Sequence, residues 1–131
     1  FSAALDDAGL APAGFVGADF TFAGGYRAAK QILGSPDRPT AIFAASDEMA
    51  FGAILAARDL GLLVPHDVSI IGIDGHDQAD FFGLSTVAQH PRHQGAHAAE
   101  VLLAELTGSA APASEVPFEL ITRTSTARPR P

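Results

Sequence analysis

Apolar and polar positions follow one another along the chain in blocks, and these blocks predict an ordered succession of helices and strands. Apolar residues at helical spacing, closed by glycine or proline, predict helices over Ser2–Ala8, Phe22–Leu33, Asp47–Leu60 and Pro91–Leu106. Short apolar runs bounded by polar residues predict strands over Gly14–Ala18, Thr40–Ala45, Val68–Ile73, Leu84–Gln89 and Val116–Arg123. Two of these runs, Thr40–Ala45 and Val68–Ile73, are continuous, as expected of strands buried on both faces.

The order of these elements predicts the class of the fold. Strands that alternate with helices build right-handed βαβ units, which place their strands side by side and parallel. The sequence therefore predicts an α/β fold with an open, mostly parallel sheet flanked by helices. The Asp47–Leu60 helix has the clearest boundaries, with Ser46 as its N-cap and Gly61 as its C-terminal stop.

Composition and charge narrow the range of functions. The 131 residues include 8 lysines and arginines against 15 aspartates and glutamates, a net charge of −7, which argues against direct binding to nucleic acid. The apolar runs are far shorter than the roughly 20 residues of a membrane-spanning helix. Without cysteine the chain can form no disulfide or thiolate site. Because Phe1 is not an initiator methionine, we expect the chain to be part of a longer protein.

Polar and aromatic side chains follow the predicted strands where each one ends. In an open parallel sheet, the carboxyl ends of the strands form the edge where ligands bind. Carboxylates and amides can bind hydroxyl groups, and an aromatic ring can pack on the apolar face of a sugar, so this set favours a polyhydroxylated ligand. The candidate ligand-binding residues are Phe20, Ser46, Asp47, Asp74 and Gln89.

Most of these residues also have a purely structural interpretation. Ser46 can serve only as an N-cap, and Asp47 can serve only the dipole of the helix that follows. Asp74 precedes Gly75 and can form a turn, and Phe20 can belong to the core. The sequence leaves both interpretations open.

The sequence lacks the common catalytic and metal-binding patterns. Nucleophile-elbow, phosphate-loop and zinc-protease motifs do not occur, and the adjacent acids Asp47 and Glu48 point apart on a helix. His90, His93 and His97 lie near one another in sequence, but no carboxylate joins them at a metal-ligand spacing. We expect these histidines to lie on a solvated helix face, and we expect no enzyme, no metal site and no cofactor.

The Asp47–Leu60 helix carries more apolar residues than one sheet face can cover. Phe51 and Leu55 widen its apolar stripe, and Phe81 and Phe82 form a second apolar feature in a loop rich in aspartate and glycine. These features favour a partner surface. The alternative is that they fill the core of the chain itself.

A resemblance to a known family rests on three stretches of the chain. They are PTAIFAASDEMAFGA at 39–53, VPHDVSIIGID at 64–74 and FELITRTST at 118–126, the last of which contains the pattern E-L-x-x-R-x-S-T. In content and order these stretches resemble the effector-binding domain of LacI/GalR-type bacterial transcription regulators. The resemblance implies the C-terminal subdomain of a type I periplasmic-binding-protein-like fold, in which two α/β subdomains hold a ligand in the cleft between them.

The resemblance also implies roles for individual residues. Phe20 matches the aromatic residue that stacks on the effector, Asp74 matches the acid that grips hydroxyls or ring nitrogens, and Gln89 matches a polar contact at the hinge. Ser46 departs from the asparagine that is common at its position, and Gly75 resembles the sugar-binding relatives. The resemblance therefore implies a sugar effector in preference to a nucleobase.

The resemblance implies a homodimer and an incomplete domain. Phe51 and Phe82 match dimer-interface positions, and Leu55 lies on the same helix as Phe51. Residues 1–90 and 115–127 would form the C-terminal subdomain. Residues 91–114 would be a helix that crosses to a missing N-terminal subdomain and exposes apolar residues such as Leu102 and Leu103.

Taken together, the residues and the resemblance favour a cytoplasmic, effector-sensing and dimerising fragment of a LacI-type regulator. Operator DNA would be bound only through an absent helix-turn-helix domain. The alternative is the periplasmic sugar-binding component of a transporter, but the ending at 118–126 favours the regulator. We also expect the fragment to depend on self-association or on rearranged packing for its stability.

Overall fold

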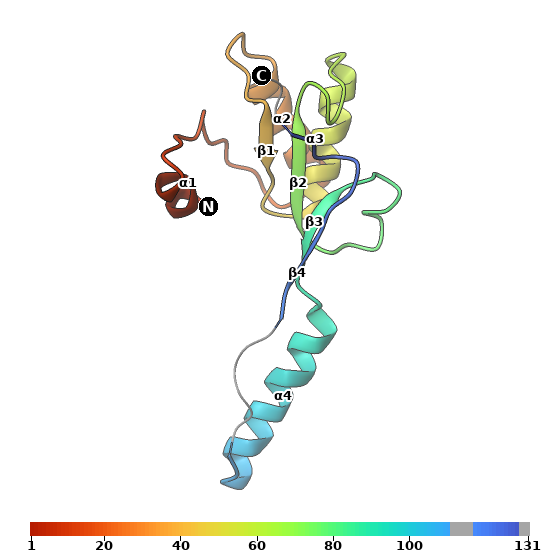
Figure 1. Ribbon diagram of the computed structural model, residues 1–131. Helices are drawn as coiled ribbons and strands as arrows, with labels where there is room; N and C mark the ends of the chain where they lie inside the picture. The colour runs from red at the N-terminus through yellow and green to blue at the C-terminus, as the bar shows by residue number, and fades with distance from the viewer. Residues whose placement is uncertain (111–116, 129–131) are drawn as a thin grey trace.

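The computed structural model describes residues 1–110 and 117–128 (Figure 1). The helices are α1 (Ser2–Asp7), α2 (Phe22–Leu33), α3 (Asp47–Asp59) and α4 (Pro91–Thr107). The strands are β1 (Ala41–Phe43), β2 (Ser69–Asp74), β3 (Ser85–Ala88) and β4 (Glu119–Ile121). All four predicted helices and four of the five predicted strands are present, so the α/β class is confirmed. Val116, where the last strand was predicted to begin, lies outside the described residues.

The four strands form one sheet in their order along the chain, β1-β2-β3-β4. β1 pairs with β2 in parallel, with Ile42 opposite Ile70, and β2 pairs with β3 in parallel. β4 pairs with β3 in the antiparallel direction, with Leu120 opposite Val87. The mostly parallel sheet is thus confirmed, and the carboxyl ends of β1, β2 and β3 share one edge.

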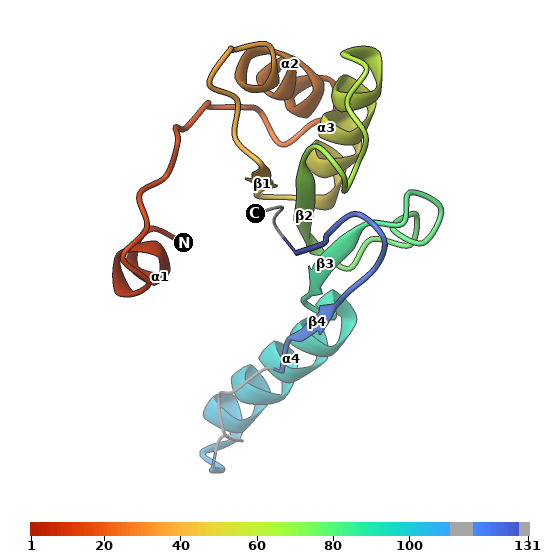
Figure 2. The same cartoon turned by 45° about the horizontal axis from the view of Figure 1, so that its top comes forward.

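α3 packs on β2 at one face of the sheet, and α2 crosses α3 closely (Figure 2). Glycines allow this crossing, because a β-carbon on Gly25 would collide with the backbone of Met49, and one on Gly52 would lie 2.6 Å from the backbone nitrogen of Tyr26. The core between the helices and the sheet consists of small and branched apolar side chains. It includes Ala29, Leu33, Ala50, Phe51, Ala53, Ala56, Ala57, Val68, Ile70 and Leu84.

The helices cover one face of the sheet, which corrects the expectation that two strands are buried on both faces. In β1, Ala41 and Phe43 are exposed and Ile42 is half-buried. β2 buries alternate residues, such as Ile70, as expected of a strand with one covered face. On the other face the ring of Phe1 stacks on Phe43, with 5.1 Å between the ring centroids.

The predicted strand over Gly14–Ala18 is wrong. This stretch is irregular and curves around the outside of β1 toward α2 (Figures 1 and 2). A strand needs a neighbour for its backbone N–H and C=O groups, and among the described residues β1 pairs with β2 alone. Phe15 instead packs edge-on against Phe1 at 6.3 Å between ring centroids and stays 69% exposed.

α4 leaves the body of the molecule and buries none of its residues (Figure 1). Leu102 and Leu103 are each 61% exposed and Leu106 is 83% exposed, which confirms that this helix presents apolar residues to solvent. Residues 111–114, the end of the predicted crossing segment, lie outside the described residues. No helix within the described ranges is long and apolar enough to cross a membrane.

The crossing of α2 and α3 generates a prediction. Gly52→Ala places a methyl group against the backbone of α2, so we expect it to lower the free energy of unfolding by about 1–3 kcal/mol, as overpacked cores do. Gly95→Ala is the control, because nothing lies within 4 Å of a β-carbon at that exposed position of α4. Urea unfolding followed by circular dichroism measures both variants. Equal stability of the Gly52→Ala variant and the parent chain would contradict the close crossing.

Candidate functional site

β2 ends at Asp74, whose carboxyl group is hydrogen-bonded from two neighbouring elements. Its Oδ2 accepts the backbone N–H of Asp47, the first residue of α3, at 3.3 Å. Its Oδ1 accepts the side-chain amide of Gln89, just beyond β3, at 3.3 Å. The backbone N–H of Gln89 also donates to the carbonyl oxygen of Asp74 at 3.2 Å. The structure thus brings together three of the predicted ligand-binding residues at the carboxyl edge of the sheet.

The surroundings of Asp74 disfavour its charged form. Partial burial raises the pKa of Asp74 above its usual range, and the nearby carboxyl group of Asp47 adds to the rise. The hydrogen bond from the Asp47 backbone N–H opposes it. Further hydrogen bonds donated by a ligand would stabilise the charged form of this carboxyl group. Asp74 is therefore suited to bind hydroxyl or ring N–H groups.

Ser46 and Asp47 are both buried, and their side chains bond to backbone groups of the protein. Ser46 is 7% exposed, and its hydroxyl oxygen caps α3 by accepting the Met49 backbone N–H at 3.2 Å. Asp47 is completely buried, and its Oδ2 accepts the His76 backbone N–H at 2.8 Å. The N-cap role of Ser46 is therefore confirmed, and a contact of Ser46 with a ligand stays a prediction. Asp47 contacts the turn after β2.

Phe20 precedes α2 in a turn with a positive φ of 58° and is 64% exposed. The turn is held by Thr21, whose hydroxyl donates to Asp19 Oδ1 at 2.6 Å. Because the start of α2 packs on the start of α3, Phe20 belongs to the same edge of the sheet as Asp74. It does not line the cavity beside Asp74.

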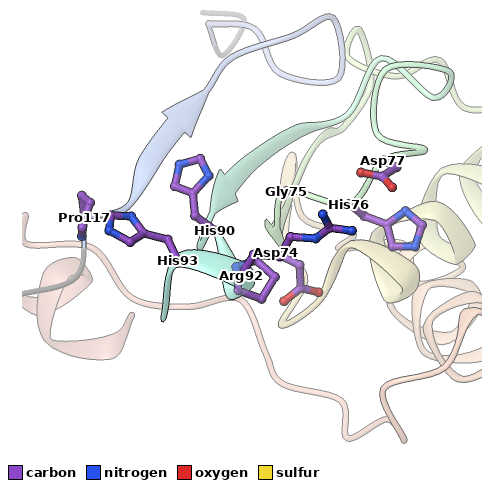
Figure 3. A pocket seen from close by; sticks show the side chains of 9 residues that line it. Asp74, Gly75, His76, Asp77, His90, Arg92, His93 and Pro117 are labelled. Carbon is purple, nitrogen blue, oxygen red and sulfur yellow. The ribbon is translucent and has the colours of Figure 1, made fainter. Parts of the chain in front are cut away.

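A cavity of about 740 Å³ opens at Asp74 (Figure 3). One side comes from the turn after β2, and the other comes from the first turn of α4 and from the segment before β4. Figure 3 shows His90 and His93 on one side and His76 and Asp77 on the other, with Asp74 between them. The lining residues are Asp74, Gly75, His76, Asp77, His90, Pro91, Arg92, His93 and Pro117.

Arg92 and the three histidines of the cavity were not predicted to line a site. His90 and His93 were predicted to lie on a solvated helix face, and both are exposed. Their position could have revealed them, since His90 directly follows Gln89 at the end of β3. His90 has a φ of 50°, which turns the chain from β3 into α4 beside the cavity. Within residues 1–110 and 117–128, no three histidine or acidic side chains are grouped so as to hold a metal ion.

The aromatic residues of the predicted partner surface differ in exposure: Phe51 lies in the core, and Phe81 and Phe82 lie at the surface. Phe51 is 2% exposed and stacks on Phe82 at 4.4 Å between ring centroids, so Phe51 belongs to the core and the expectation of an interface role for it is corrected. Leu55 is half-buried, and Phe82 is 38% exposed. The neighbouring Phe81 is 89% exposed. The loop aromatics, and not Phe51, are therefore available to a partner.

Comparisons with known proteins agree with this fold. The family model of the periplasmic binding protein-like domain matches residues 1–126. The HTH-type transcriptional repressor PurR of Edwardsiella ictaluri is 40% identical over 133 residues, which cover 97% of this chain and 39% of the relative. The chain thus spans about two fifths of the length of that curated relative.

Solved structures of related regulators have the same fold as this chain. A dimeric Lac repressor with a C-terminal deletion matches with a TM-score of 0.88 at 28% identity, over 95% of this chain and 47% of that one. A LacI family regulator from Arthrobacter sp. FB24, solved in complex with lactose, matches with a TM-score of 0.82 at 30% identity, over 95% of this chain and 48% of that one. The fold and the family match define the class of this chain as a periplasmic-binding-protein-like α/β domain. The chain belongs to the periplasmic binding protein-like domain family, and these relatives are repressors and regulators of the LacI and PurR type.

The raised pKa of Asp74 generates a prediction for stability. Ionised Asp74 destabilises the folded chain above its folded-state pKa, and this cost disappears below the ordinary aspartate value of 3.8. We therefore expect the stability of the parent chain, relative to that of Asp74→Asn, to rise as the pH falls from 7 through the folded-state pKa of Asp74. Urea unfolding at a series of pH values measures the difference. Asp37→Asn, at an exposed loop position, is the control. A stability difference between Asp74→Asn and the parent chain that does not change with pH would contradict the prediction.

Proposed function

We propose that this chain is the effector-sensing part of a cytoplasmic LacI-type transcriptional regulator and that its effector is a sugar. Operator DNA would be bound by another part of the parent protein, because this acidic chain carries a net charge of −7. Relatives that are transcriptional repressors support a binding role over an enzymatic one, and they favour a regulator over a transporter component.

One observation carries the sensing role. The cavity at Asp74 is lined both by the turn after β2 in the body of the molecule and by the first turn of α4, which leaves the body. A ligand in this cavity would contact both parts at once. Its binding energy would depend on the angle between them, and such a difference between states is what lets a ligand shift a conformational equilibrium.

A sugar fits the chemistry of the cavity edge. Asp74 and Gln89 offer a carboxylate and an amide to vicinal hydroxyls. The exposed ring of Phe20 offers an apolar surface, but it lies outside the lining of the cavity. The Arthrobacter regulator, with lactose bound, supports the same class of ligand. A nucleobase is the second candidate, because Asp74 can equally accept ring N–H groups, and the PurR relative is more similar in sequence than the lactose-bound regulator.

The effector class can be tested by thermal shift with a panel of neutral sugars, including lactose, and of nucleobases. We expect a sugar to raise the melting temperature, because a ligand that binds only the folded state stabilises it, by about 2.7 kcal/mol at a hundredfold excess over Kd. Asp74→Asn should abolish the shift, and the exposed Asp37→Asn should retain it. A rise in melting temperature with nucleobases alone would show that the effector is a nucleobase and not a sugar. If no compound of the panel changes the melting temperature, the proposed sensing role is wrong.

The exposed apolar residues of α4 support self-association, and we propose that the isolated chain forms dimers or larger assemblies through them. Sedimentation should therefore give a mass above the 13.5 kDa of one chain. Leu103→Glu combined with Leu106→Glu should return the mass to that of a monomer, because charges cannot be buried at an apolar interface without a partner. Glu100→Gln on the same exposed helix is the control. A monomeric parent chain would contradict the proposal.

A further inference from the structure

The turn after β2 has a backbone that side chains disfavour. Asp74 has a φ of 136° and Gly75 a φ of 74°, and the first of these is rarely adopted by a residue other than glycine. A β-carbon on Gly75 would lie 2.7 Å from that of Ala88, so the turn is also pressed against the end of β3. Such a conformation persists only where surrounding contacts hold it.

Asp47 supplies those contacts from the start of α3. Its Oδ2 accepts the His76 N–H at 2.8 Å, and its own backbone N–H donates to Asp74 Oδ2 at 3.3 Å. One residue therefore binds both ends of the turn. Gly72 in β2 leaves room for this side chain, because a β-carbon there would collide with Asp47 Oδ1.

The burial of Asp47 separates this role from the two that the sequence suggested. The side chain is 0% exposed. Its Oδ1 is closed to solvent and has no hydrogen-bond partner within residues 1–110 and 117–128, so the carboxyl group is not placed to contact a ligand. Service to the helix dipole alone does not require burial, as the exposed Glu48 in the same first turn shows. Enclosing a carboxyl oxygen without a partner costs about 1–3 kcal/mol, which the contacts to the turn must offset.

We propose that Asp47 is a positioning residue, which fixes the turn from Asp74 to His76 and thereby aims the Asp74 carboxylate along the cavity. The inference rests on the proposed function only in taking Asp74 as the ligand contact. Asp47 itself touches no effector. It acts through the backbone N–H of His76 and through the direction that this bond imposes on Asp74.

Nuclear magnetic resonance of the full 131-residue chain tests the proposal without a ligand. Asp47→Asn keeps an acceptor for the His76 N–H but removes the charge, and Asp47→Ala removes both. Glu48→Gln is the matched control, since it removes an exposed acid from the same helix turn. The readouts are hydrogen exchange of the His76 amide and the pH titration of the Asp74 carboxyl carbon.

In Asp47→Ala we expect the His76 amide to exchange about tenfold faster than in the parent chain, because its hydrogen bond is lost. Asp47→Asn should restore the protection while lowering the pKa of Asp74, since the neighbouring charge is gone. Glu48→Gln should leave the amide protected and lower that pKa by less, because its carboxyl group adds least to the rise.

Unchanged His76 protection in Asp47→Ala would overturn the proposal. If that variant does not fold, an Asp74 titration in Asp47→Asn identical to that of the parent chain would overturn it as well. The proposed function fails separately, in the thermal-shift panel: a chain that shows the expected amide and carboxyl effects but binds no panel member retains Asp47 as positioning residue and loses the sensing role.

Discussion

The enclosed carboxyl group of Asp47 is the constraint on which the geometry of the strand-end edge depends. Among the described residues it is the one ionisable side chain in the buried set. Burying a carboxyl group is costly unless hydrogen bonds replace those to water, and here the N–H of His76 does so for Oδ2. The glycine at 72, the first turn of α3 and the unusual backbone of Asp74 are therefore linked features. A change in any of them would leave the others without their partner.

A second set of hydrogen bonds fixes the opposite end of the same strands. The hydroxyl of Ser125 donates to the carbonyl oxygen of Ile70 at 2.6 Å and accepts the backbone N–H of Ser85 at 2.8 Å. The backbone N–H of Ser125 donates to the carbonyl oxygen of Gly83, also at 2.8 Å. This buried serine joins the segment after β4 to β2 and to the start of β3. With Asp47 at the other end, β2 is held at both ends, so the cavity edge has a fixed support.

The features that the sequence predicts well are those set by local interactions. α2 has its predicted bounds, and α3 begins at its predicted N-cap because the Ser46 hydroxyl needs only the next turn. Strand formation and burial are not local. The stretch 14–18 has the pattern of a strand but no neighbour to pair with, and Phe51 has the pattern of an exposed stripe but lies under Phe82.

The residues of the candidate site also differ in how well local sequence predicts their positions. Asp74 and Gln89 follow their strands directly, and strand order alone predicts that they meet. The sequence also placed Asp47 at this edge, but only the packing of α3 against β2 shows that its carboxyl group faces inward. The cavity histidines come from the direction in which α4 leaves β3, and that direction depends on the φ of His90. No periodicity in the sequence encodes this direction.

The exposure of α4 and the shape of the cavity are linked, because both depend on the direction in which α4 leaves the body. Most helices in proteins are stabilised by tertiary packing, and none of the residues of α4 is buried against the body. The first turn of that helix nevertheless forms one side of the cavity. A second copy or another part of a longer chain that covers Leu102, Leu103 and Leu106 would fix the direction of α4. It would thereby reduce the entropy lost when a ligand binds, so assembly and effector affinity should rise together.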